Sequence, residues 1–186
     1  MYLDETGSSL KTTVRRTWAP KGQTPIIQTC LNWSNLSIIG AITTDGRVFQ
    51  HTYRHTVRAV HVIAFLTHVL RHVHGIVILD RAGIHRAKAI GAFLEEHPRL
   101  TLAFLPPYGP ELNPVEWLWA YIKRNVIANF VARDLGTLHD RWKLGFQRVR
   151  QRIFRAVLPG AGRGCVGARA GVGDHAAVDA RAWRDR

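Results

Sequence analysis

LPPYGPELNPVEWLWAYIKR, residues 105–124, decides how the second half of the chain is organised. Prolines at positions 106, 107 and 110 fix φ, so the stretch begins as a stiff, non-helical loop. Asn113 is a favoured helix N-cap, and Pro114 suits the first helical position. Apolar residues then recur at helical spacing. The stretch therefore predicts a rigid loop that leads into a helix beginning at Asn113.

Glu116 stands in the first turn of this predicted helix, and two interpretations of it are open. In a capping box, its carboxylate only reaches back to the Asn113 backbone. Alternatively, the rigid loop holds a functional carboxylate in place. The second interpretation gains weight because Asp4 and Asp80 stand in comparable settings, each beside a predicted strand end.

Composition points to a polyanionic partner. The chain has 186 residues, enough for one domain with a real core. Lys plus Arg is 26 and Asp plus Glu is 13, which gives a formal charge of +13. Such a surplus indicates nucleic acid as the simplest partner, although an arginine-rich composition is also what a GC-rich genome produces.

Cysteine usage and hydropathy indicate a cytoplasmic protein that does not enter membranes. Cys30 and Cys165 form no CxxC pair and predict neither a disulfide framework nor a zinc site. The sequence contains no apolar run of roughly 18 residues and no signal peptide at its start.

The first third of the chain is typical of antiparallel strands. Residues 1–6 resemble the end of a strand, and residues 26–31 and 36–42 predict two short strands. Thr44-Asp45-Gly46 predicts a hairpin turn, with residues 47–53 as the returning strand. Asp45 is therefore interpreted as a turn residue rather than a catalytic one.

Helices and strands alternate from residue 57 onward. Residues 57–73 have helical spacing, and His61, His68 and His72 share one face, which we interpret as solvated or DNA-facing rather than as a metal stripe. GIVILD, residues 75–80, is typical of a buried parallel strand that ends in Asp80. A helix over 85–97 and a strand over 100–105 complete the pattern.

The last predicted helix begins at residue 134 and is amphipathic, with a possible break near Gly145. Its polar face is rich in arginine, so contact with a phosphate backbone is plausible. Residues 159–186 are mostly Gly, Ala and Arg and predict a flexible tail after a domain over 1–158. The odd composition of this tail also suggests frame-shifted translation.

The three carboxylates suggest phosphoryl transfer. If the strands carrying Asp4 and Asp80 are adjacent and parallel, their carboxyl ends meet, and Glu116 can close over the same place. Oxygen ligands of this kind suit Mg²⁺ or Mn²⁺. Two such ions about 4 Å apart can activate a nucleophile and stabilise the leaving oxygen of a phosphodiester.

Four motifs resemble a known family: LDETG at residues 3–7, RRTWAPKGQTP at 15–25, VILDRAGIHRAKAI at 77–90 and, above all, residues 105–124. They resemble the catalytic domain of DDE transposases, in the bacterial insertion-sequence branch of the Tc/mariner superfamily. The interval 116 − 80 = 36 also matches that group. The resemblance covers about residues 2–155.

The resemblance implies an α/β, ribonuclease-H-like fold, with a mixed central sheet of antiparallel hairpin strands and parallel strands flanked by helices. It implies that Asp4, Asp80 and Glu116 form an acidic triad holding two Mg²⁺ or Mn²⁺ ions. Cleavage of transposon ends and strand transfer into target DNA follow from this assignment. We expect a homodimer in the active complex.

Six residues are assigned to DNA contact. His85 matches a recurrent histidine that supports the site or DNA, and Arg81 replaces an Asn common in relatives, while Trp119 is interpreted as core. The DNA-contact set is Arg81, His85, Lys123, Arg124, Arg148 and Arg152. Relatives carry N-terminal helix-turn-helix modules that we do not find here, so a catalytically inactive DNA-binding remnant remains the alternative.

Overall fold

The computed structural model describes residues 1–29, 33–107 and 109–157, and for 153–157 it describes the backbone alone. Within these residues the chain builds one five-stranded sheet in the order β3-β2-β1-β4-β5. The strands are β1 (Tyr2–Ser9), β2 (Asn35–Ile42), β3 (Val48–Tyr53), β4 (Gly75–Leu79) and β5 (Leu100–Phe104).

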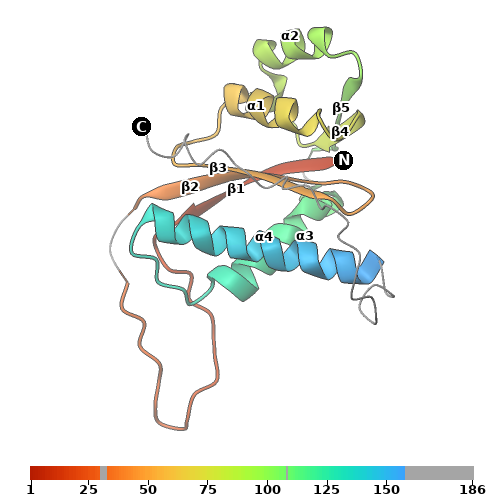
Figure 1. The fold of residues 1–186 in the computed structure, drawn as a ribbon. Coiled ribbons are helices and arrows are strands. Elements are labelled where there is room, and N and C mark those ends of the chain that lie inside the picture. Colours follow the sequence, from red (N-terminus) through yellow and green to blue (C-terminus); the bar gives the residue numbers. More distant parts are fainter. Residues whose placement is uncertain (30–32, 108, 158–186) are drawn as a thin grey trace, which may run out of the picture.

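Helices cover both faces of this sheet. Figure 1 shows α1 and α2 on one face and α3 and α4 on the other. The long helices are α1 (Ala59–Val69), α2 (Lys88–Glu96), α3 (Pro114–Ile122) and α4 (Leu135–Val157). Short turns precede or follow them: the 3₁₀ turns η1 (Gly83–Arg86) and η2 (Pro110–Leu112), and the π-helical turn η3 (Lys123–Ile127).

The sheet is mixed, as the sequence predicts. β1 pairs with β2 and β2 with β3 in antiparallel fashion, whereas β4 runs parallel to both β1 and β5. The predicted hairpin turn is confirmed: the Thr43 amide donates to the Arg47 carbonyl, and Gly46 adopts φ 83°, which favours glycine. The mixed pairing brings the first strand of the chain to the centre of the sheet.

Strand alternation in β1 separates two hydrophobic cores. Leu3 is fully buried among residues of α1 and α2, whereas Tyr2 packs at the edge of the core under α3 and α4. The α3/α4 core is centred on Trp119, Trp142 and Phe146. Successive residues of β1 therefore point to different helical layers, which places Asp4 and Glu5 on opposite faces.

The prediction of a strand over residues 26–31 is wrong for the part that the structure describes. Residues 26–29 lie in a long connection between β1 and β2 rather than in a strand, while residues 30 and 31 lie outside the described part. This connection extends away from the sheet (Figure 1). Its first part is anchored, because the Arg15 amide donates to Oδ1 of Asn129 at 2.7 Å and Nδ2 of Asn129 returns a bond to the Arg15 carbonyl.

Helix α4 passes through Gly145 without the predicted break. Gly145 is there for a packing reason: a Cβ at this position would come within 2.7 Å of Cγ2 of the buried Ile122. The residue thus allows α4 and α3 to approach closely, at the cost of a weaker helix former. The predicted tail lies outside the described residues.

His61 and His68 of α1, and His72 just after this helix, are partly buried against β3. His68 and His72 contact the ring of Phe49 in β3, with ring centroids 6.3 and 5.8 Å away, and His61 lies 4.6 Å from the ring of Tyr53. The interpretation of this face as fully solvated or DNA-facing does not hold, because the face packs in part against β3. It failed because the partner strand β3 cannot be located from the helix sequence alone.

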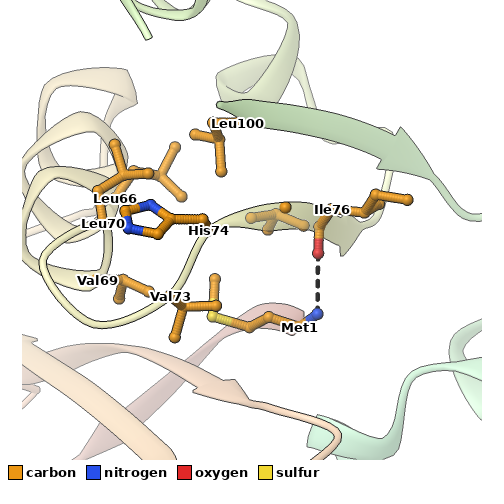
Figure 2. A pocket seen from close by; sticks show the side chains of 10 residues that line it. Met1, Leu66, Val69, Leu70, Val73, His74, Ile76 and Leu100 are labelled. Atoms are coloured by element: carbon orange, nitrogen blue, oxygen red, sulfur yellow. Dashed lines mark hydrogen bonds between the residues drawn. The ribbon is translucent and has the colours of Figure 1, made fainter. Parts of the chain in front are cut away.

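A shallow apolar hollow lies between the end of α1 and the start of β4 (Figure 2). Leu66, Val69, Leu70 and Val73 line it from the helical side, and the N-terminal amine of Met1 closes it by donating to the Ile76 carbonyl at 2.9 Å. The hollow is at the opposite end of the parallel strands from Asp4 and Asp80. We therefore treat it as a packing feature of the core.

Candidate functional site

Asp4 and Asp80 occupy equivalent positions on two neighbouring parallel strands. The register of β1 and β4 pairs Tyr2 with Ile78. Two residues further on, β1 carries Asp4 and the chain leaving β4 carries Asp80. The two aspartates therefore lie level with each other, at the edge of the sheet where β4 ends. Asp4 is not at the end of its own strand, because β1 continues to Ser9, so residues 1–6 are the first part of a strand and not its end.

Asn113 ties the helix of Glu116 to the strand of Asp4. Its Oδ1 accepts the Val115 amide and caps α3, while its Nδ2 donates to the Leu3 carbonyl at 3.0 Å. The side chain is 2% exposed, so both bonds are shielded from water. The backbone amide of Asn113 donates to the Pro110 carbonyl. A capping box would need this same amide as the donor to the Glu116 side chain. Glu116 is exposed in the first turn.

Trp119 holds the carboxylate of Asp4. The indole Nε1 donates to Oδ2 of Asp4 at 2.8 Å. Trp119 is 2% exposed, which confirms its interpretation as core. Gly40 lies directly opposite Asp4 in the β1–β2 pairing, and a Cβ at Gly40 would overlap the far edge of the indole. The glycine therefore leaves the space that lets the ring reach Asp4.

The environment of Asp4 favours a nearby cation. Burial raises the pKa of Asp4 to about 6, and the negative charges of Glu116 and Glu5 add to the rise, while the hydrogen bond from Trp119 opposes it. Glu116 is therefore close enough to Asp4 to interact with it electrostatically. A group of like charges of this kind becomes more stable when a cation binds among them.

Asp80 is held from the other face of the sheet. Its Oδ1 accepts the Ala82 amide at 2.9 Å and Nδ1 of His85 at 2.7 Å. Nε2 of His85 contacts Oε1 of Glu5 at 3.0 Å. Burial alone would lower the pKa of His85, but the hydrogen bond and charge of Glu5 and the charge of Asp80 more than offset it, so the pKa is raised.

The three carboxylates fit a divalent cation by donor type, since hard cations of this class take carboxylate oxygens. Over residues 1–29, 33–107 and 109–157, however, no group of three or more His, Cys, Asp or Glu side chains stands in position to hold a metal ion. In this arrangement Trp119 engages one oxygen of Asp4, and His85 engages one oxygen of Asp80.

Basic side chains lie near this edge and along α4. Arg81 and Arg124 are exposed, and Nζ of Lys123 donates to Oγ1 of Thr6 within β1. Arg148 and Arg152 line a groove that also includes Tyr121, where the Arg152 guanidinium lies 5.0 Å from the ring centroid. His85 is different, because it is 1% exposed and DNA cannot reach it in this arrangement.

Other arginines of the predicted basic face have structural partners. The Arg150 guanidinium donates to the Val48 carbonyl, and Nε of Arg141 donates to the Val126 carbonyl. Burial lowers the pKa of Arg150. The amphipathic pattern of α4 shows a row of cations but cannot separate those that bond to the fold from those that face solvent.

Sequence reasoning missed Glu5 and Gly40. Glu5 is adjacent to Asp4, yet alternation sends it to the face of His85. The only available indication was the acidic pair Asp4-Glu5 in a short strand. Gly40 gave none, because its role depends on the cross-strand register and on a ring that arrives from α3.

A comparison with protein families shows to which family the chain belongs. The model of the DDE superfamily endonuclease family matches residues 1–139. The chain belongs to this family. A curated relative, uncharacterized protein y4pE/y4sA of Sinorhizobium fredii, is 41% identical over 61 residues, which are 33% of this chain and 42% of the relative.

Solved structures with a similar fold include complexes of the Mos1 mariner transposase. The paired-end complex with Mn has a TM-score of 0.59 at 15% identity and matches 85% of this chain and 54% of that chain. The strand transfer complex gives 0.58 at 16% identity, with 85% and 53% coverage. The isolated Mos1 catalytic domain gives 0.51 at 15% identity, with 85% and 81% coverage.

These likenesses establish the fold of this DDE endonuclease family member. It is the ribonuclease-H-like fold that the sequence predicts. The chain spans about half the length of the Mos1 chains in those complexes and 42% of the curated relative. None of the helices in the described part is long and apolar enough to cross a bilayer.

Proposed function

We propose that this chain is the catalytic domain of a DNA transposase, which cleaves transposon ends and transfers the strand into target DNA. The proposal places divalent-metal ligands at Asp4, Asp80 and Glu116. Two Mg²⁺ or Mn²⁺ ions would supply activation of a hydroxyl nucleophile and charge stabilisation at the leaving oxygen. The similar Mos1 structures include a strand transfer complex and a paired-end complex with the left transposon end, in agreement with this activity.

One observation carries the proposal: Asp4 and Asp80 stand at equivalent positions of two adjacent parallel strands, with Glu116 close enough to raise the pKa of Asp4. Asn113 fixes the relation between strand and helix, because it bonds to both. A structural set of acidic residues would be paired with Lys or Arg, whereas Asp4 is held by a neutral indole.

The remaining residues bind or orient. Trp119 holds Asp4 in one rotamer, and His85 holds Asp80. Lys123 lies on the same side of α3 as Glu116, two turns further on, where its ammonium can meet a phosphate. Arg81 and Arg124 extend the basic edge, and Arg148 and Arg152 form a second basic site on α4. We also propose that the active complex is a homodimer.

A nicking assay tests the activity without knowledge of the transposon ends. Supercoiled plasmid is incubated with the chain and Mn²⁺ or Mg²⁺, and nicked product is measured. The wild type should nick only with metal, and Glu116→Gln should abolish nicking while the circular dichroism spectrum is unchanged. Glu111→Gln is a matched control, because Glu111 is an exposed carboxylate five residues earlier. Full activity in Glu116→Gln would refute the assignment.

The second candidate is a DNA-binding remnant without catalysis. Two observations favour it. Hydrogen bonds engage Asp4 and Asp80, and among the described residues no three His, Cys, Asp or Glu side chains are placed to hold a metal ion. Plasmid that is bound by the wild type but never nicked at any Mn²⁺ concentration, while added Mn²⁺ leaves the melting temperature unchanged, would establish this alternative.

A further inference from the structure

His85 bridges the two strands that carry the aspartates. It lies in η1, is 1% exposed, and has a hydrogen-bond partner for each ring nitrogen. Nδ1 contacts Oδ1 of Asp80 at 2.7 Å and the Asp80 carbonyl at 3.2 Å. Nε2 contacts Oε1 of Glu5 at 3.0 Å. A buried ring with both nitrogens engaged cannot turn without breaking a bond.

The roles of donor and acceptor in this bridge are fixed by chemistry. The Asp80 carbonyl and an ionised carboxylate accept hydrogen bonds and donate none. Nδ1 of His85 therefore donates to Asp80, and Nε2 donates to Glu5 when that carboxylate is ionised and the imidazole carries both protons. Glu5 holds the imidazole ring through Nε2, and the ring in turn holds the Asp80 carboxylate through Nδ1. Removing the side chain of Glu5 leaves Nε2 of a buried ring without a hydrogen-bond partner in either protonation state, which weakens the constraint on the ring position.

We propose that Glu5 is a positioning residue of the metal site, acting through His85 to fix the carboxylate of Asp80. The inference rests on the proposed function. The Ala82 amide and His85 both bind Oδ1 of Asp80, so Oδ2 takes no part in this pair of bonds and is the oxygen available to a cation. Glu5 touches no substrate and is not a catalytic residue.

Strand geometry explains why the adjacent acidic residues have different roles. Asp4 shares the face of Tyr2 and meets Trp119, whereas Glu5 shares the face of Leu3 and meets His85. β1 therefore supplies one metal ligand directly and supports the second ligand from its other face. The two aspartates are coupled through a single strand, although 76 residues separate them (80 − 4).

Outer partners of metal ligands typically change metal affinity by 10–100-fold when they are removed. We expect Glu5→Leu to raise the Kd for Mn²⁺ by about tenfold or more on this basis. Glu5→Gln should lose less, because its amide oxygen still accepts the bond from Nε2. Glu95→Leu is the matched control, since Glu95 is an exposed carboxylate on α2. Asp80→Asn is the reference for loss of a ligand.

The experiment measures Mn²⁺ binding by electron paramagnetic resonance on the whole chain, without DNA. Imidazole ¹⁵N spectra of the same proteins report the His85 ring, and thermal midpoints report folding. The proposal expects the order wild type, Glu5→Gln, Glu5→Leu in rising Kd, with the His85 nitrogen resonances displaced in Glu5→Leu. A purely structural Glu5 would lower the thermal midpoint and leave the Kd unchanged.

Each remaining outcome is decisive. If the wild type binds Mn²⁺ and Asp80→Asn weakens binding, an unchanged Kd in Glu5→Leu overturns the inference and leaves the proposed function intact. Should the wild type bind no Mn²⁺, or should Asp80→Asn bind as well as the wild type, the proposed function fails, and the role of Glu5 fails with it.

Discussion

Nε1 of Trp119 donates a 2.8 Å hydrogen bond to Oδ2 of Asp4, so one of the two buried tryptophans of the α3/α4 core also supports the candidate site. The indole sits against Trp142 and Phe146 in edge-to-face contacts and above Gly40. Core packing thus fixes the position of a carboxylate at the sheet edge. Substitutions in this core should therefore change the candidate site as well as the stability of the fold.

Trp119→Phe should weaken both folding and metal binding. The phenyl ring preserves part of the packing but removes the N–H, and hydrogen bonds to charged groups contribute about 1.5–3 kcal/mol. We expect the free energy of unfolding in urea to fall by about 2–3 kcal/mol on that basis, together with a rise in the Kd for Mn²⁺. Trp117→Phe, at a side chain that is 73% exposed, serves as the control. Equal effects of both substitutions would contradict the role of the indole.

Gly40→Ala should destabilise the fold through its contact with Trp119. Overpacking of this kind costs about 1–3 kcal/mol. In the Trp119→Phe background the added methyl group meets a smaller ring, so the cost should shrink, and the double-mutant cycle should show coupling of about 0.5–3 kcal/mol. Gly7→Ala, where a Cβ meets nothing within 4 Å, is the comparison. Additive costs would show that Gly40 has another role.

Much of this site could be predicted from the sequence, and the limits have a physical cause. Asn113, Pro114 and Glu116 could be placed because capping and proline rules are local. The level placement of Asp4 and Asp80 follows from the parallel pairing of β1 with β4. Gly40 could not be found, because its role depends on which residue of another strand lies opposite and which ring arrives from α3.

Asp4→Asn should stabilise the metal-free fold at neutral pH. The unfolded chain ionises Asp4 near its ordinary pKa of 3.8, whereas the folded chain does so at about 6. The folded state holds the additional proton between these values, so stability falls as pH rises from about 4 to about 6. The shift corresponds to about 3 kcal/mol at most, and partial exposure reduces it to about 1–2 kcal/mol.

Urea unfolding of wild type and Asp4→Asn at pH 4 and pH 7.5 checks this prediction. The two proteins should be equally stable at pH 4, and the variant should be more stable at pH 7.5. Saturating Mn²⁺ should stabilise the wild type alone and reduce the difference, because ligands that bind the native state add to its stability. A variant that is less stable than the wild type at pH 7.5 would contradict the conclusion that the partly buried charge of Asp4 destabilises the folded state.

Acid should loosen the packing of α1 on β3 through His51. Burial, with a smaller contribution from the charge of His68, lowers the pKa of His51 to about 4. The unfolded chain binds the proton near 6.5, so stability is lost as pH falls from about 6.5 toward 4. His51→Gln should flatten the fall in unfolding free energy between pH 7.5 and pH 5, while His74→Gln, at an exposed position, should not.

Arg148 and Arg152 should contact a phosphate backbone, whereas equally exposed arginines on the α1/α2 side should not. The groove that they share with Tyr121 and Gln151 is open and polar, and stacking on Tyr121 orients the Arg152 guanidinium. Each lost phosphate contact reduces the slope of log K against log salt by about one. Replacing both arginines by serine should therefore lower the slope by about two, measured by fluorescence anisotropy with duplex DNA. The matched pair Arg86→Ser and Arg99→Ser removes the same charge and should change the slope less, and identical slopes for the two pairs would place the DNA elsewhere.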